Sequence, residues 1–210
     1  MGVALSRGRT AALGVRVKSG WAMTVLLGGP AATPRLLDRR RIELADPAVP
    51  RTRQPYHAGF GIEQTSRRTI ARLVRIVERC ARISLGRLVR GYRAVGVSVR
   101  GVGIVVGSVI DPRRIANPHI RAHASEGALF RRVVEDAARR RGLGSVVTLE
   151  LDVYATAARA LRRPTARVKR AVAALGATVE GSWRAEEKTA AAAAWLVLAR
   201  RSRAARTRPR

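Results

Sequence analysis

Two histidines and a glutamate, His119, His123 and Glu126, stand at positions i, i+4 and i+7. In an α-helix this spacing places all three side chains on one face, and the apolar residues that continue the face predict that it points inward. Imidazole and carboxylate groups in this arrangement can bind a transition metal or act as an acid–base pair. The alternative is a pair of hydrogen-bonded, half-buried histidines. His57, the remaining histidine, is the further ligand that the chain offers.

Two carboxylates form a second candidate site. The segment Ser145 to Val153 (SVVTLELDV) alternates as a strand does, which predicts Glu150 and Asp152 on the same face. Carboxylate oxygens are the ligands that Mg²⁺ prefers. The alternative is that both acids pair with neighbouring arginines, which are present in large excess.

An amphipathic helix is predicted over Thr65 to Val89, with Thr65 or Ser66 as its N-cap. Apolar residues fall on one stripe, which must be buried against strands. Five arginines, which we call the arginine ridge, fall on the opposite stripe: Arg68, Arg72, Arg75, Arg79 and Arg82. Such a ridge either contacts the phosphates of a nucleic acid or is a solvated outer face.

The composition favours a polyanionic partner. The net charge is +28, and among 42 basic residues only Lys18, Lys169 and Lys188 are lysine. A GC-rich genome accounts for abundant arginine, but not for the presence of only 14 acidic residues. Counterion release on phosphate neutralisation explains the surplus. The single cysteine, Cys80, excludes an internal disulfide, and no stretch reaches the roughly 18 to 20 apolar residues of a membrane span. We expect a cytoplasmic protein.

Residues 200–210 predict a disordered basic tail, because they are too polar to pack against a core. Its six arginines are Arg200, Arg201, Arg203, Arg206, Arg208 and Arg210.

Hydrophobic patterning predicts three strands, then a helix, a strand, a helix, a strand and further helices. The strands are expected at 11–18, 21–27, 35–44, 95–110 and 145–153. The helices are expected at 65–89, 117–141, 154–161, 164–175 and 185–201, and residues 45–61 are expected to form a loop.

This order resembles the ribonuclease H-like fold, and the second half is similar to Holliday-junction resolvases of the RuvC kind. The segments that carry the resemblance are GIVVGSVID, HIRAHASEGALFRRVVEDAARRRGL, VVTLELD, PTARVKRAVAALG and EEKTAAAAAWLVL. The resemblance implies an α/β fold in which helices flank a mixed sheet of three antiparallel strands followed by alternating helices and strands. Residues 1–199 would form one such domain.

The resemblance also implies two magnesium ions, held by acids on the first strand, the fourth strand and the last helix. Arg16 and Lys18 stand where the first-strand acid is expected, and the fourth strand has no acid before Asp111. Only Glu186 and Glu187 match the last helix. The resemblance therefore supports the fold and argues against nuclease activity.

The leading hypothesis is a nucleic-acid-associated protein that lacks standard two-metal nuclease activity and contacts phosphate through the arginine ridge and the tail. One alternative is a divergent metal-dependent nuclease or hydrolase, which would need a divalent ion such as Mg²⁺. Its catalytic residues would be Asp111, Glu150, Asp152 and Glu187, with His119, His123 and Glu126 as further metal ligands. The other alternative is a non-enzymatic module that binds an acidic protein.

Overall fold

A five-stranded mixed sheet forms the centre of the computed structural model, which describes residues 9–206. Its order is β3-β2-β1-β6-β7. Strands β1 (Arg9–Lys18), β2 (Trp21–Gly28) and β3 (Arg35–Glu43) are antiparallel neighbours, while β6 (Val97–Val106) and β7 (Ser145–Leu149) run parallel to β1. The predicted mixed sheet, with three antiparallel strands first, is confirmed.

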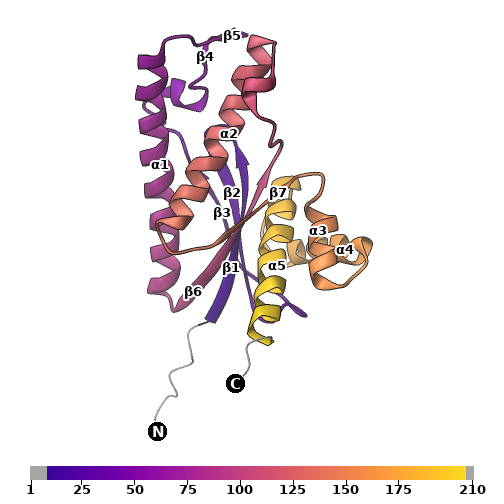
Figure 1. The fold of residues 1–210 in the computed structure, drawn as a ribbon. Helices are drawn as coiled ribbons and strands as arrows, with labels where there is room; N and C mark the ends of the chain where they lie inside the picture. The colour runs from indigo at the N-terminus through magenta and orange to yellow at the C-terminus, as the bar shows by residue number, and fades with distance from the viewer. Residues whose placement is uncertain (1–8, 207–210) are drawn as a thin grey trace.

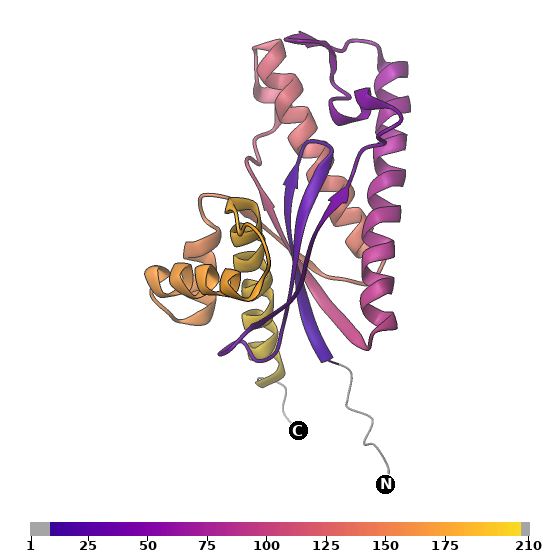
Figure 2. The ribbon, with the colours of Figure 1, turned by 180° about the vertical axis from the view of Figure 1, so that it is seen from behind.

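Helices cover both faces of this sheet (Figures 1 and 2). One face carries α1 (Arg67–Ala94) and α2 (Pro118–Arg139). The other carries α3 (Val153–Leu161), α4 (Thr165–Leu175) and α5 (Ala185–Arg206). Because side chains alternate along a strand, Leu13 and Val15 of β1 face α1 and α2, whereas Ala12 faces α5. Arg16 and Lys18 share the parity of Ala12 and therefore belong to the face that α5 covers.

The α5 helix lies unusually close to the sheet. A Cβ on Gly14 of β1 would lie 1.8 Å from the carbonyl oxygen of Ala190, and one on Gly103 of β6 would lie 2.4 Å from that of Ala193. Glycines on the strands and alanines on the helix make this approach possible. As a result, the first turn of α5, with its two acids, reaches the end of β1.

The α1 helix confirms the predicted amphipathic pattern. Ser66 is its N-cap and accepts a hydrogen bond from the Thr69 amide at 3.3 Å. Leu73 and Val77 are fully buried, and all five arginines of the ridge are exposed. The helix continues to Ala94, beyond the predicted end at Val89, because Tyr92 is buried and donates a hydrogen bond to Asp38 at 2.6 Å.

Other predicted boundaries are also wrong. Residues 45–61 are not all loop, since they contain a 3₁₀ turn (Pro50–Arg53) and β4 (His57–Gly59), which pairs with β5 (Ile62–Glu63). The strand expected at 95–110 ends at Val106.

The strand expected at 145–153 ends at Leu149, because Asp152 already has α-helical dihedrals before α3. Glu150 and Asp152 therefore do not share a strand face.

The C-terminal helix is longer than predicted. The backbone stays helical to Arg206, although a disordered tail was expected from residue 200, because alanine and arginine are strong helix formers. The predicted phosphate contacts at Arg201, Arg203 and Arg206 involve side chains outside the described structure, and Arg208 and Arg210 lie outside the described residues. Within residues 9–206, no helix is both long and apolar enough to cross a membrane.

Candidate functional site

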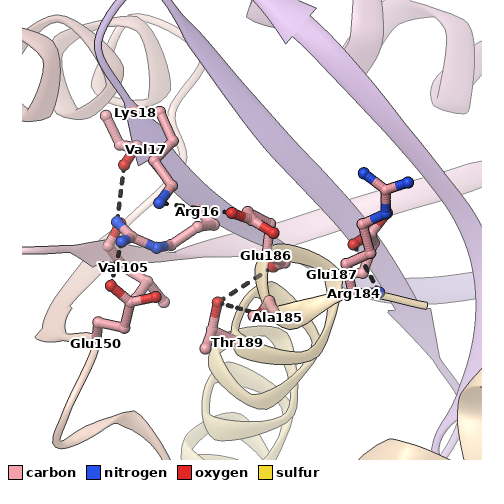
Figure 3. Close-up of polar contacts among 10 residues, drawn as sticks. All are labelled: Arg16, Val17, Lys18, Val105, Glu150, Arg184, Ala185, Glu186, Glu187 and Thr189. Carbon is pink, nitrogen blue, oxygen red and sulfur yellow. Dashed lines mark hydrogen bonds and ion pairs between the residues drawn. The ribbon is translucent and has the colours of Figure 1, made fainter. Parts of the chain in front are cut away.

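The end of β1 carries a buried guanidinium where the fold resemblance calls for an acid. Arg16 is only 3% exposed. Its Nη1 donates to the carbonyl oxygen of Val17 at 2.8 Å and lies 3.5 Å from that of Val105, while its Nη2 pairs with the Glu150 carboxylate (Figure 3). Alternation along β1 places Arg16 on the sheet face that α5 covers, where its guanidinium meets Glu150 from the turn after β7.

The two acids of α5 are also paired. Lys18 Nζ lies 3.5 Å from Glu186 Oε1 (Figure 3). Glu187 is buried, accepts a hydrogen bond from the Arg184 amide at 3.1 Å and pairs with Arg39 at 3.2 Å. The backbone amide of Glu186, together with Lys18 and Arg16, holds the pKa of the Glu186 carboxyl below its usual value.

The remaining predicted catalytic acids lie elsewhere. Asp111 accepts hydrogen bonds from Arg113, which lowers the pKa of the Asp111 carboxyl, and Asp152 is exposed at the start of α3. Among residues 9–206, the four predicted catalytic carboxylates do not form a group close enough to share an ion.

The residues at the end of β1 do not fit the pair of magnesium ions that the fold resemblance implies. Arg16 and Lys18 have no lone pair to offer a cation while they are protonated, and they neutralise Glu150 and Glu186 instead. The predicted alternative of acid–arginine pairing is therefore what the structure shows for Glu150.

A histidine cluster forms where β4 meets the first turns of α2. The ring centroids of His57, His119 and His123 lie 4.5 to 5.4 Å apart, and one nitrogen from each ring lies within 4.8 Å of the others. We call these three residues the histidine cluster. Burial and the two neighbouring imidazoles lower the pKa of His123.

Glu126 lies beneath the histidine cluster. Its side chain is 1% exposed, and its Oε1 lies 2.7 Å from Nδ1 of the buried His57. Its other oxygen, Oε2, lies 3.8 Å from Nδ1 of His123. Burial raises the pKa of the Glu126 carboxyl, and the contact with His57 opposes that effect. Glu126 was predicted to be a metal ligand together with His119 and His123. In the structure its carboxylate lies against the imidazoles of His57 and His123.

A basic groove runs between α1 and α2. It consists of two hollows of about 400 and 460 Å³, and both are lined by Arg82 and Arg140. We define the basic groove by the arginines that line these hollows: Arg75, Arg79, Arg82, Arg90, Arg140 and Arg141. Of the predicted arginine ridge, Arg68 and Arg72 are exposed on α1 but do not line the groove.

The acids of this groove are neutralised by arginines outside it. Glu78 pairs with Arg132 at 3.2 Å, and Asp136 pairs with Arg139 at 2.7 Å. The groove arginines form no ion pair with any residue of the described chain. Their positive charge is therefore available to a ligand.

The fold is ribonuclease H-like. The chain is similar to the Thermus thermophilus RuvC structure, with 13% identity and a TM-score of 0.51, over 92% of this chain and 96% of that chain. It is also similar to T. thermophilus RuvC in complex with Holliday junction substrate, with 12% identity and a TM-score of 0.53, over 92% and 95% of the two chains. No protein-family model matches the sequence, and no curated protein sequence matches it.

Only part of the basic groove and of the histidine cluster could be recognised from the sequence. Arg90 continues the arginine stripe beyond Val89, where the helix was expected to end, so its role was missed. Arg140 and Arg141 close a second helix, and only the parallel packing of α1 and α2 brings them to the ridge. His57 lies far from His119 in sequence, and the pairing of β4 with β5 places it there.

Proposed function

We propose that this protein binds nucleic acid through phosphate contacts in the basic groove and does not cleave it by a two-metal mechanism. The observation that carries the proposal is the charge balance of the groove. Six arginines line two adjoining hollows, while the two acids there are already paired with other arginines. Arginines of α1 and arginines at the end of α2 line the same hollows, although their charges repel one another. A helix face that only meets solvent does not require this convergence.

Guanidinium groups suit phosphate because their planar donors form paired hydrogen bonds with its oxygens. The residues that line the two hollows include no aromatic side chain on which a base could stack. We therefore propose binding that is mainly electrostatic and weakly dependent on base sequence.

The proposal that cleavage is lost rests on Arg16 and Lys18. In the ribonuclease H-like fold the end of β1 would supply an acid to the metal site, and here it supplies two cations that neutralise Glu150 and Glu186. Incubation with junction, duplex and single-stranded DNA in Mg²⁺ or Mn²⁺ is expected to give no cut product. Metal-dependent cleavage that Glu150→Gln abolishes would support the hydrolase alternative instead.

Binding can be tested by fluorescence anisotropy with labelled duplex, four-way junction and single-stranded DNA at low salt. The variant Arg82→Glu/Arg140→Glu is expected to bind at least tenfold more weakly than the wild type. It should also lower the slope of log affinity against log salt by about 0.9 for each lost contact with a duplex phosphate. Both effects follow if these two arginines neutralise phosphates.

A matched control is Arg167→Glu/Arg170→Glu on α4, which makes the same change in net charge on the opposite side of the sheet. Equal loss of affinity in the two double variants would show that net charge, and not the groove, governs binding. No detectable binding by the wild type at low salt would overturn the proposal. Association with an acidic protein that persists after nuclease treatment would favour the interaction-module alternative.

A further inference from the structure

We propose that His57, His119 and His123 form a binding site for a divalent transition-metal ion, with Zn²⁺ as the preferred ion and Glu126 as the residue that orients the ligands. The site lies between β4 and the first turns of α2, away from the end of β1. The proposal is independent of nucleic-acid binding. It replaces the predicted ligand set of His119, His123 and Glu126, because the geometry makes His57 a ligand and Glu126 its support.

Three imidazoles converge at this site. His119 and His123 are one helical turn apart on α2, and β4 brings His57 to them from a different part of the chain. One nitrogen from each ring lies within 4.8 Å of the others. Tetrahedral zinc with Zn–N bonds of about 2.0 to 2.1 Å needs nitrogens roughly 3.4 Å apart. His119 and His123 are more exposed than His57, so rotation about their side-chain bonds can close that difference.

One of these imidazoles has a buried nitrogen without a hydrogen-bond partner. His57 is 7% exposed, and its Nδ1 is engaged by the Glu126 carboxylate at 2.7 Å. With the proton on Nδ1, the lone pair of Nε2 is free. This Nε2 is buried and has no hydrogen-bond partner in the described structure. Buried polar atoms normally have a partner, and a metal ion held by the three neighbouring imidazoles would supply one.

The Glu126 carboxylate lies next to the imidazoles of His57 and His123. A carboxylate that accepts the second N–H of a metal-bound histidine fixes the tautomer and strengthens the ligand. Glu126 Oε1, at 2.7 Å from His57 Nδ1, is placed to do this for His57, and its Oε2, which is also buried without a hydrogen-bond partner, lies 3.8 Å from Nδ1 of His123. Glu126 is thus placed to orient two of the three imidazoles.

An ion pair holds the elements that carry the three histidines together without a bound ion. Arg121, which lies between the two helical histidines, forms a two-bond ion pair with Glu63 of β5 at 2.9 and 2.5 Å. Since His57 of β4 is the register partner of Glu63 of β5, this ion pair holds the β4–β5 hairpin, and with it His57, against α2. The preference for zinc-like ions over Mg²⁺ follows from three nitrogen donors, because Mg²⁺ prefers oxygen.

The test uses full-length protein treated with a chelator and then dialysed. Calorimetry with Zn²⁺ is expected to show one ion per chain, and Mg²⁺ is expected to show none. Cobalt should give the intense visible bands of a four-coordinate ion. The variant His119→Ala/His123→Ala removes two exposed ligands without opening the core, and we expect at least a hundredfold loss of Zn²⁺ affinity.

Two further variants make the result specific. Cys80→Ser removes the only thiol and is expected to bind Zn²⁺ as the wild type does. Glu126→Gln keeps an oxygen that can accept from His57 but removes the charge, and we expect a 10- to 100-fold loss of affinity with the cobalt spectrum retained. Absence of Zn²⁺ uptake by the wild type would overturn the proposal. So would unchanged affinity in the double histidine variant, or loss of binding in Cys80→Ser.

Discussion

The end of β1 and the histidine cluster both gather groups that can bind cations, but they leave those groups in opposite states. At the end of β1, Glu150 and Glu186 each lie against a basic side chain of the same strand. In the histidine cluster, Glu126 engages one nitrogen of His57 and leaves the other nitrogen buried and unpaired. The acids of the first region are already paired with cations, and the second region holds a buried nitrogen without a hydrogen-bond partner.

The difference shows that the availability of a carboxylate or imidazole to a metal ion depends on the other groups to which it is hydrogen-bonded. A carboxylate bonded to a guanidinium already has a cation beside it, so a metal would have to displace that cation. A carboxylate bonded to an imidazole N–H directs the opposite nitrogen outward as a ligand. Counting acids therefore points to the end of β1, whereas following the hydrogen bonds points to the histidine cluster.

Gly14→Ala should have the largest effect on stability, because it disturbs the backbone contact between β1 and α5. Gly14→Ala would place a Cβ 1.8 Å from the carbonyl oxygen of Ala190, so α5 must move away from β1 and take its acids with it. We expect a loss of more than about 3 kcal/mol in the free energy of unfolding, measured by urea denaturation. Gly91→Ala in α1 is the matched control, because a Cβ there meets nothing within 4 Å and alanine favours helix. Wild-type stability in Gly14→Ala would contradict the close approach.

A smaller effect separates the two partners of the buried ion pair. Glu150→Gln leaves the Arg16 guanidinium, whose side chain is 4% exposed, without a counter-charge. We expect a loss of about 3 kcal/mol, at the low end for a broken buried pair because Glu150 is 36% exposed. Arg16→Met removes the charge and fills similar space, so it should cost less. Urea denaturation of both variants at pH 7 measures this asymmetry, and equal losses would show that packing dominates over charge.

Most of the fold could be predicted from the sequence because its patterns are local. The alternation of β1 and β2, the Asn117 N-cap of α2 and the amphipathic stripe of α1 each depend on neighbours within a few residues. The failures arose where distant packing decided the outcome. Tyr92 carries α1 past Gly91 because its ring is buried and its hydroxyl reaches Asp38, and neither contact leaves a local signal.

The candidate sites were less predictable for the same reason. The sequence indicated that His119, His123 and Glu126 share a face, but only the folded structure brings His57 of β4 close to these histidines. The predicted strand face for Glu150 and Asp152 was wrong, because β7 ends at Leu149 and the chain turns into α3. The pairing of Glu150 with Arg16 joins the turn after β7 to β1, which is not a neighbour of β7 in the sheet, and such contacts depend on topology.

Zn²⁺ should stabilise the protein through the histidine cluster and not through the end of β1. If the histidine cluster binds Zn²⁺ in the folded state alone, Zn²⁺ at a hundred times its dissociation constant should stabilise the protein by about 2.7 kcal/mol. Thermal unfolding with and without Zn²⁺ measures this effect. The same addition should not stabilise His119→Ala/His123→Ala, whereas Glu150→Gln should gain as much as the wild type. A zinc effect that disappears in Glu150→Gln would place the ion at the end of β1.

The smallest expected effect concerns pH and Glu186. Its own backbone amide, together with Lys18 and Arg16, holds the pKa of the Glu186 carboxyl below the usual value of 4.5. Because the folded-state pKa is the lower one, ionised Glu186 stabilises the folded protein above pH 4.5, and this contribution is lost as the pH falls through the folded-state pKa. Glu186→Gln should therefore flatten the acid limb of stability against pH.

At pH 7 the same substitution should cost less than about 1 kcal/mol, because the Lys18 and Glu186 side chains are 35% and 27% exposed and solvent screens their attraction. Lys18→Met is the matched control. It removes one stabilising contact but leaves the backbone amide in place, so it should flatten the acid limb only in part. Denaturation midpoints between pH 3 and pH 7 measure both variants. An acid limb that is identical in Glu186→Gln and the wild type would mean that Glu186 titrates alike in the folded and unfolded chains, and that its contact with Lys18 does not persist in solution.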